Sequence, residues 1–140
     1  MTKISPFFVF NGQCAEAIEL YEKALGAKVS STYTYGKSKD PKCADPAKKD
    51  WIYHAQMKLG RSTLMLCDGD ESKLEGGTRQ RNNELYLCVE FDTSDEVRAA
   101  FNIMKEGGKV LEDMDTAPYS ELFVLIEDKF GIRWWLMTAE

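Results

Sequence analysis

The chain has 140 residues, of which 44% are hydrophobic and 29% are charged, and its formal net charge is −5. This length and balance are typical of an ordinary globular protein, so we expect a single domain over residues 1–140. The negative charge argues against nucleic acid as a partner, because binding phosphates needs an excess of Lys and Arg. No apolar run approaches the roughly 20 residues of a membrane span, and no signal-peptide pattern precedes the first strand. We therefore expect a cytoplasmic protein with no membrane partner.

The first half of the chain predicts one strand, one helix and three more strands. Pro6–Phe10 is an apolar strand, and residues 13–25 repeat apolar side chains at helical spacing until Gly26 ends the helix. Residues rich in Val, Thr and Tyr, or alternating in polarity, predict strands over 27–35, 51–59 and 62–67. The intervening segment 36–50 is rich in lysine, aspartate and proline and predicts a loop without regular structure, which could also act as a lid.

The second half repeats this order of elements. A strand over 84–91 precedes a helix that begins at a capping box, Thr93 and Glu96, and ends at Gly107. Three more strands are predicted over 109–114, 122–126 and 132–137. The polar stretch 69–83 predicts a linker between a first module, about 4–68, and a second, about 84–138.

Residues of the two halves match at fixed offsets. Phe10 and Phe91 are 81 residues apart, as are Gly26 and Gly107, with no gap across strand and helix. The hairpin glycine Gly60 matches Gly131 at an offset of 71, because the first copy has a loop ten residues longer. The sequence thus predicts an α+β fold of two tandem βαβββ modules.

Two such modules in one short chain resemble the vicinal oxygen chelate superfamily, which includes glyoxalases, bleomycin resistance proteins and extradiol dioxygenases. The segments 10–21, 54–60, 63–68 and 128–134 are similar to its PhnB-like branch. The resemblance implies a curved, mostly antiparallel sheet around a cleft, and a homodimer. The methyltransferase label common in that branch has no support here, because the chain has no Gly-rich loop for a methyl-donor nucleotide.

Metal-dependent members of the superfamily hold an ion with residues on the first and last strand of each module. Carried over through the internal offsets, those positions are Ser5, Leu64, Tyr86 and Trp135. None is a good ligand for a divalent ion, which favours His, Asp, Glu or Cys. We therefore expect no metal and no other cofactor.

His54 is the only histidine in the sequence. If its strand alternates, it shares a face with Gln56 and Lys58, opposite Tyr53, Ala55 and Met57. It could be a hydrogen-bonded surface histidine or a pocket residue that binds a polar substrate or moves a proton. The predicted substrate-binding residues are Phe8, Trp51, His54, Gln56, Tyr86 and Trp135, and His54 is the one catalytic candidate.

The four cysteines form no C-x-x-C pair and, with His54, no zinc-binding spacing. We expect four free thiols, mostly buried as small apolar residues, and Cys43 in its polar loop is the best candidate for an exposed, reactive thiol.

The residues leave three functions open. The first is a metal-independent protein that binds an unidentified small molecule. The second is a lyase, isomerase or transferase in which His54 acts with an acid such as Glu90 or Glu121. The third is a metalloenzyme with displaced ligands. The residues favour a binding protein over an enzyme, and the sequence does not identify the substrate.

Overall fold

Each helix forms where apolar side chains recur at helical spacing. The computed structural model describes residues 2–69 and 85–139. Helix α1 (Cys14–Leu25) buries one apolar stripe and ends at Gly26, whose φ of 72° is left-handed, as a glycine C-cap requires. Helix α2 (Ser94–Met104) begins where the Thr93 hydroxyl accepts a hydrogen bond from the Glu96 N–H. The Glu96 carboxylate accepts the Thr93 hydroxyl proton, so the capping box forms with a side-chain contact in place of the expected second backbone contact.

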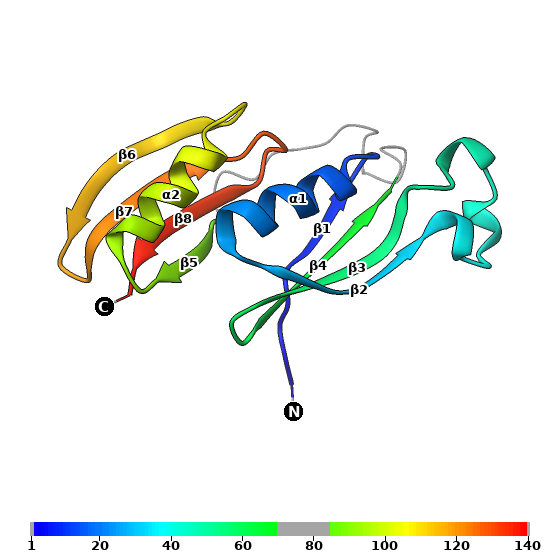
Figure 1. The fold of residues 1–140 in the computed structure, drawn as a ribbon, viewed down its shortest axis with the longest axis horizontal. Coiled ribbons are helices and arrows are strands. Elements are labelled where there is room, and N and C mark those ends of the chain that lie inside the picture. Colours follow the sequence, from blue (N-terminus) through cyan, green and yellow to red (C-terminus); the bar gives the residue numbers. More distant parts are fainter. Residues whose placement is uncertain (1, 70–84, 140) are drawn as a thin grey trace. The chain divides into compact units, whose positions relative to one another are not determined.

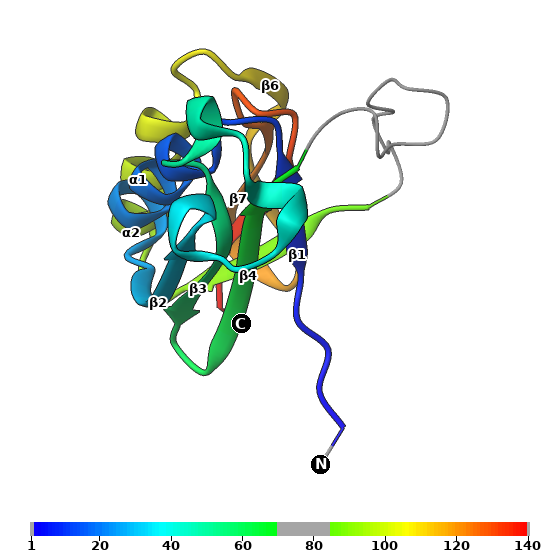
Figure 2. The ribbon, with the colours of Figure 1, turned by 90° about the vertical axis from the view of Figure 1, so that its right-hand side faces the viewer.

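The chain divides into two compact units, residues 1–79 and 80–140. Unit 1 has four strands: β1 (Phe7–Phe10), β2 (Lys28–Thr34), β3 (Ile52–Leu59) and β4 (Ser62–Asp68). They form one sheet in the order β1-β4-β3-β2, in which β1 and β4 are parallel and the other pairs are antiparallel. Helix α1 covers one face of this sheet, as Figures 1 and 2 show, and among the described residues of unit 1 no α-helix covers the other face.

Unit 2 repeats this plan. Its strands are β5 (Leu87–Phe91), β6 (Lys109–Ala117), β7 (Ser120–Glu127) and β8 (Arg133–Thr138). Their order, β5-β8-β7-β6, is that of unit 1 with the same single parallel pair. The predicted α+β architecture of two βαβββ modules is therefore confirmed. The predicted linker, 69–83, lies outside the described residues except for Gly69.

Two elements differ from the predictions. The β6–β7 connection is a tight hairpin, because β6 continues to Ala117 and β7 begins at Ser120, so the expected loop through Pro118 is two residues long. The predicted loop in the first half is not irregular. It contains three short 3₁₀ helices: η1 (Tyr35–Lys37), η2 (Pro41–Cys43) and η3 (Pro46–Lys48). Among the described residues, no helix has the length and hydrophobicity needed to cross a membrane.

Candidate functional site

Unit 1 contains a cavity of about 670 Å³. It lies where residues 35–50, called the lid segment from here on, leave the sheet beyond the ends of β2 and β3 (Figure 1). The sheet contributes Phe7, Tyr33, Tyr53, His54, Cys67 and Asp68 to its lining. The lid segment contributes Tyr35, Ser38, Lys39, Asp40, Lys42 and Cys43. Its volume is within the range of small-molecule sites in proteins.

The sheet side of the cavity follows from strand alternation. Phe8 and Phe10 on β1 are buried toward α1, and Phe8 contacts the Tyr21 ring at 6.0 Å between centroids. Phe7 therefore points to the opposite face, where it is 49% exposed. There its ring meets the His54 imidazole edge-on, with 5.6 Å between centroids. The sequence prediction placed Phe8 at the site; the structure puts Phe8 in the core and Phe7 at the cavity.

His54 lies on the face of β3 that α1 does not cover, together with Gln56, while Ala55 and Met57 are buried on the helix side. This alternation was predicted. Tyr53 departs from it, because it is 43% exposed and lines the same cavity as His54. The pairing of β2 with β3 shifts register between Tyr33 and Thr34, opposite this point, which explains why regular alternation fails here.

The imidazole of His54 has no hydrogen-bond partner within the described parts of the chain, and Phe7 is the contact that orients it. Of the predicted acid partners, Glu90 lies on β5 and Glu121 on β7 of unit 2, and neither lines this cavity.

Asp68 fixes the base of the cavity to the rest of unit 1. Its carboxylate accepts hydrogen bonds from the Cys14 N–H at the start of α1 and from the Ile52 N–H at the start of β3, each at 2.9 Å. Its carbonyl oxygen accepts the Tyr35 hydroxyl proton at 2.7 Å. Helix α1 has no side-chain cap from Gln13, so Asp68 supplies that cap from 54 residues away.

The lid segment is held by backbone contacts at both ends. The Tyr35 N–H donates to the Trp51 carbonyl at 2.8 Å, and the Gly36 N–H donates to the Lys49 carbonyl at 2.9 Å. Side chains of Asp40 and Asp45 cap the η2 and η3 helices, whose first residues are prolines. The expectation of a loop without regular structure is therefore wrong, because this proline and aspartate chemistry caps short helices as readily as it makes turns.

Trp51 and Gln56 lie near the cavity without lining it. The Trp51 ring packs against Tyr35, 5.7 Å between centroids, and Lys48 places its ammonium 4.5 Å from the Trp51 ring centroid. A side chain at Gly12 would come within 3.0 Å of the Trp51 ring, so glycine is needed there both for space and for its φ of 83°. Trp51 thus supports the base of the lid segment. Gln56 shares the face of His54 but lies two residues further from the cavity.

The other two predicted binding residues are brought together in unit 2. The rings of Tyr86 and Trp135 meet edge-on at 5.9 Å, and Trp135 stacks on Phe123 at 5.5 Å with an interplanar angle of 23°. These side chains belong to an apolar cluster centred on Phe123, Leu125 and Met137. The Trp135 indole N–H is buried and has no hydrogen-bond partner within the described residues.

The offset used for the predicted metal positions is wrong on the last strand. Phe7 pairs with Met65 in unit 1, and Cys88, 81 residues after Phe7, pairs with Trp135 in unit 2. The equivalent of Trp135 is thus Met65, at an offset of 70, rather than Leu64. The loop between β3 and β4 has two residues and the loop between β7 and β8 has five. The offset of 71 between the hairpin glycines therefore does not apply to the strands that follow, where the offset is 70. A shift of one residue along a strand moves the side chain to the opposite face of the sheet, so Leu64 points toward α1.

This correction does not create a metal site. The thioether of Met65 is a soft and weak ligand. Among the residues that the structure describes, no three His, Cys, Asp or Glu side chains gather as a metal centre would require. Absence of a resident metal remains a prediction, to be checked on the purified protein by elemental analysis.

The comparisons with known proteins define the family. The model of the Glyoxalase/Bleomycin resistance protein/Dioxygenase superfamily matches residues 3–136, so the chain belongs to this superfamily. Protein YjdN of Escherichia coli (strain K12) is 23% identical over 147 residues, which cover 98% of this chain and 95% of YjdN. The resemblance inferred from the sequence is confirmed.

Solved structures agree with the fold. Protein PA1353 from Pseudomonas aeruginosa is 27% identical, with a TM-score of 0.83, covering 99% of this chain and 98% of that one. A putative 3-demethylubiquinone-9 3-methyltransferase, PhnB protein, from Bacillus cereus is 24% identical, with a TM-score of 0.76, covering 99% and 100%. The second likeness concerns the fold alone.

The cysteines differ in exposure from the prediction. Cys43, expected to be exposed, is 8% exposed, because η2 turns it inward to the cavity wall, whereas Cys88 is exposed. Burial raises the pKa of the Cys14 thiol well above its usual range, and the nearby negative charge of Asp68 raises it further. Burial, with the charge of Glu90, also raises the pKa of Cys88.

These pKa shifts predict the order of thiol modification. Because the thiolate is the reactive form, Cys14 should stay unmodified by a disulfide reagent in the native protein. Cys88 should react more slowly than a free cysteine near neutral pH, with a rate that keeps rising at alkaline pH. Mass spectrometry of labelled peptides measures both, and all four thiols should react in denaturant. Modification of native Cys14 as fast as free cysteine would contradict the assignment.

Proposed function

We propose that the protein binds a small aromatic molecule in the cavity of unit 1 and does so without a metal ion. The observation that supports this most is the set of aromatic side chains that remain exposed around one cavity. Phe7, Tyr33 and Tyr53 are 49%, 59% and 43% exposed, although large apolar rings are normally buried. Such rings would gain contact area and stacking energy from a planar ligand.

His54 would supply the polar contact in this site. Its ring is placed by Phe7, and its nitrogens have no hydrogen bond among the described residues. One ring nitrogen of a neutral imidazole donates and the other accepts, so the residue can bind either a hydroxyl or a carbonyl group. The homodimer expected from the family resemblance is a separate proposal, measurable as mass in solution.

The binding proposal is tested with a neutral aromatic probe, N-phenyl-1-naphthylamine, whose fluorescence rises in apolar sites. We expect saturable binding to the full-length chain, weakened about tenfold by Phe7→Ala, since an aromatic contact contributes about 1 kcal/mol beyond the area it buries. Val9→Ala is the matched control. Val9 lies two residues along β1 on the same face, is 43% exposed and does not line the cavity.

The proposed site is supported if Phe7→Ala weakens the affinity for the probe while Val9→Ala changes that affinity by less than about twofold. Equal effects of the two substitutions, or a complete absence of binding, would overturn it. Circular dichroism of each variant shows that the fold is retained, which is expected because both side chains are on the exposed face of β1.

A further inference from the structure

We propose that the unit 1 cavity selects aromatic molecules that carry an anionic group, such as an aromatic carboxylate, sulfonate or phosphate. This inference rests on the proposed function and names the class of ligand. It comes from the way charge is distributed around the cavity. The aromatic rings belong to the sheet side, and the cationic groups belong to the lid segment that faces it.

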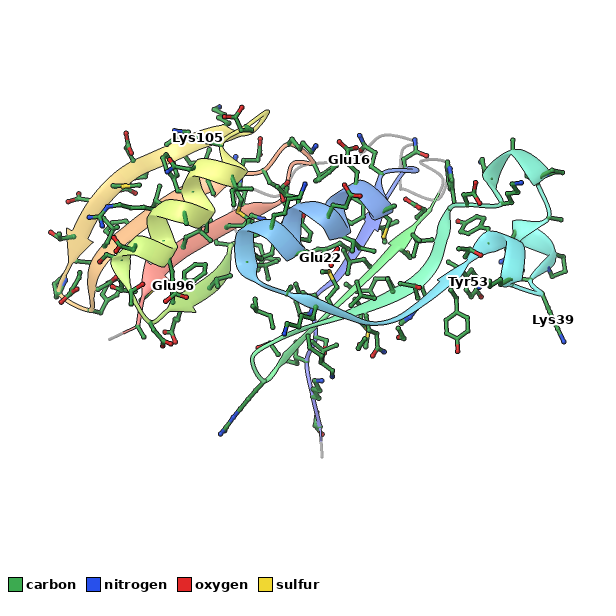
Figure 3. The ribbon with its side chains drawn as sticks, viewed as in Figure 1. Glu16, Glu22, Lys39, Tyr53, Glu96 and Lys105 are labelled. Atoms are coloured by element: carbon green, nitrogen blue, oxygen red, sulfur yellow. The ribbon has the colours of Figure 1, made fainter. Side chains whose placement is uncertain are left out.

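Two ammonium groups border the cavity, those of Lys39 and Lys42. Both residues are exposed, and within the described residues neither ammonium has an ion-pair partner. Figure 3 shows Lys39 projecting outward at the same end of unit 1 as Tyr53. A lysine stem of four flexible carbons allows its ammonium to turn toward the mouth of the cavity when an anion is there.

The two carboxylates that line the cavity are already engaged by the protein. The Asp40 carboxylate accepts hydrogen bonds from the Lys42 N–H at 3.0 Å and from the Tyr53 hydroxyl at 3.4 Å. The Asp68 carboxylate accepts two backbone N–H groups on the buried side of the sheet. Each carboxylate oxygen thus accepts a hydrogen bond from the protein, whereas the two lysine ammonium groups have no ion-pair partner among the described residues and can pair with an anion.

The net charge of the lid segment is also positive. Residues 36–50 contain five lysines and three aspartates, a balance of +2, within a chain whose net charge is −5. A segment of positive charge beside the cavity, on a negative protein, would attract an anion and give no advantage to a cation. The aromatic walls then discriminate against small inorganic anions, which gain nothing from apolar contact.

The test compares two probes with the same rings. 8-Anilinonaphthalene-1-sulfonate carries a sulfonate, and N-phenyl-1-naphthylamine lacks it. The wild-type chain should bind the sulfonate about tenfold more tightly than the neutral probe at low ionic strength, since two mouth charges together contribute on the order of one power of ten. The preference should shrink in about 0.5 M salt, where such charges are screened.

The variant Lys39→Glu/Lys42→Glu should abolish the sulfonate preference and leave the affinity for the neutral probe within about twofold. The control is Lys37→Glu/Lys49→Glu, which makes the same charge change in the same segment at exposed positions that do not line the cavity. It should retain most of the preference.

The outcomes separate the two proposals. Equal affinity for both probes in the wild type, or an equal loss of the sulfonate preference in both double variants, would overturn the anion selectivity. Neither result would contradict the aromatic binding site. Tighter binding of the sulfonate that Phe7→Ala does not weaken would place the sulfonate outside the cavity and overturn the anion selectivity, whereas the neutral probe with Phe7→Ala tests the aromatic site by itself. Loss of the sulfonate preference in Lys39→Glu/Lys42→Glu alone supports the proposal.

Discussion

Replacing Asp68 with alanine should lower the free energy of unfolding by about 3 kcal/mol. The carboxylate accepts hydrogen bonds from two buried backbone N–H groups, those of Cys14 and Ile52, for which the described residues offer no other side-chain acceptor. Removing it leaves both donors unsatisfied and uncaps α1. Urea denaturation followed by far-ultraviolet circular dichroism measures the effect.

Two further variants make this result specific. Asp68→Asn keeps one carbonyl oxygen but turns an amide N–H₂ toward the second donor, so it should cost about half as much. Asp50→Ala removes an exposed aspartate of the same unit that has no hydrogen bond or ion pair among the described residues, and should change stability by less than about 0.5 kcal/mol. Equal stabilities of Asp68→Ala and Asp50→Ala would contradict the role assigned to Asp68.

The second large effect is expected at Asp128, which holds the β7–β8 hairpin of unit 2. Its Oδ1 accepts the N–H groups of Phe130 and Ile132 at 2.9 and 3.0 Å, and its Oδ2 accepts the Trp134 indole N–H at 2.9 Å. Asp128 and Trp134 are both almost fully buried. Asp128→Ala should therefore destabilise the protein by about 3 kcal/mol or more, since three donors lose their acceptor.

The same urea titration measures the stability of Asp128→Ala and of Trp134→Phe, a variant that removes only one of the three hydrogen bonds. Phenylalanine removes the indole N–H and some volume and leaves the two backbone contacts, so its cost should be smaller than that of Asp128→Ala. Asp92→Ala, at an exposed position of unit 2, is the neutral control. A cost for Trp134→Phe that exceeds that of Asp128→Ala would show that ring packing, rather than the carboxylate, stabilises this hairpin.

The architecture could be predicted because several signals agreed. Helix α1 has its apolar stripe and ends at Gly26, and α2 has its own stripe and begins at Thr93, although it ends at Met104 rather than at the predicted Gly107. The offset of 81 holds from β1 and β5 to the start of the second strand of each unit, because the distance along the chain from Phe10 to Lys28 equals that from Phe91 to Lys109. It fails at the last strand, where the hairpins differ in length and no sequence landmark indicates which side the extra residues fall on.

The site was only partly predictable. His54 was a candidate because it is the only histidine and opens a segment similar to the PhnB-like branch, and its alternation with Ala55 and Met57 is present in β3. Phe7 was missed because β1 is apolar at every position, so the sequence does not indicate which parity faces α1. Lys39, Lys42 and the inward turn of Cys43 depend on the lid segment, whose Pro and Asp residues suit both turns and short 3₁₀ helices. Asp68 acts across 54 residues, a separation that no local pattern reports.

The most direct test of the cavity as a ligand site uses the single histidine. The ring C–H signals of His54 form one assignable set in a ¹H–¹³C spectrum, because the sequence has no other histidine. Titration with 8-anilinonaphthalene-1-sulfonate should shift these signals saturably, with the dissociation constant obtained from fluorescence. Saturation of the fluorescence while the His54 signals remain unchanged would contradict a ligand site in the unit 1 cavity.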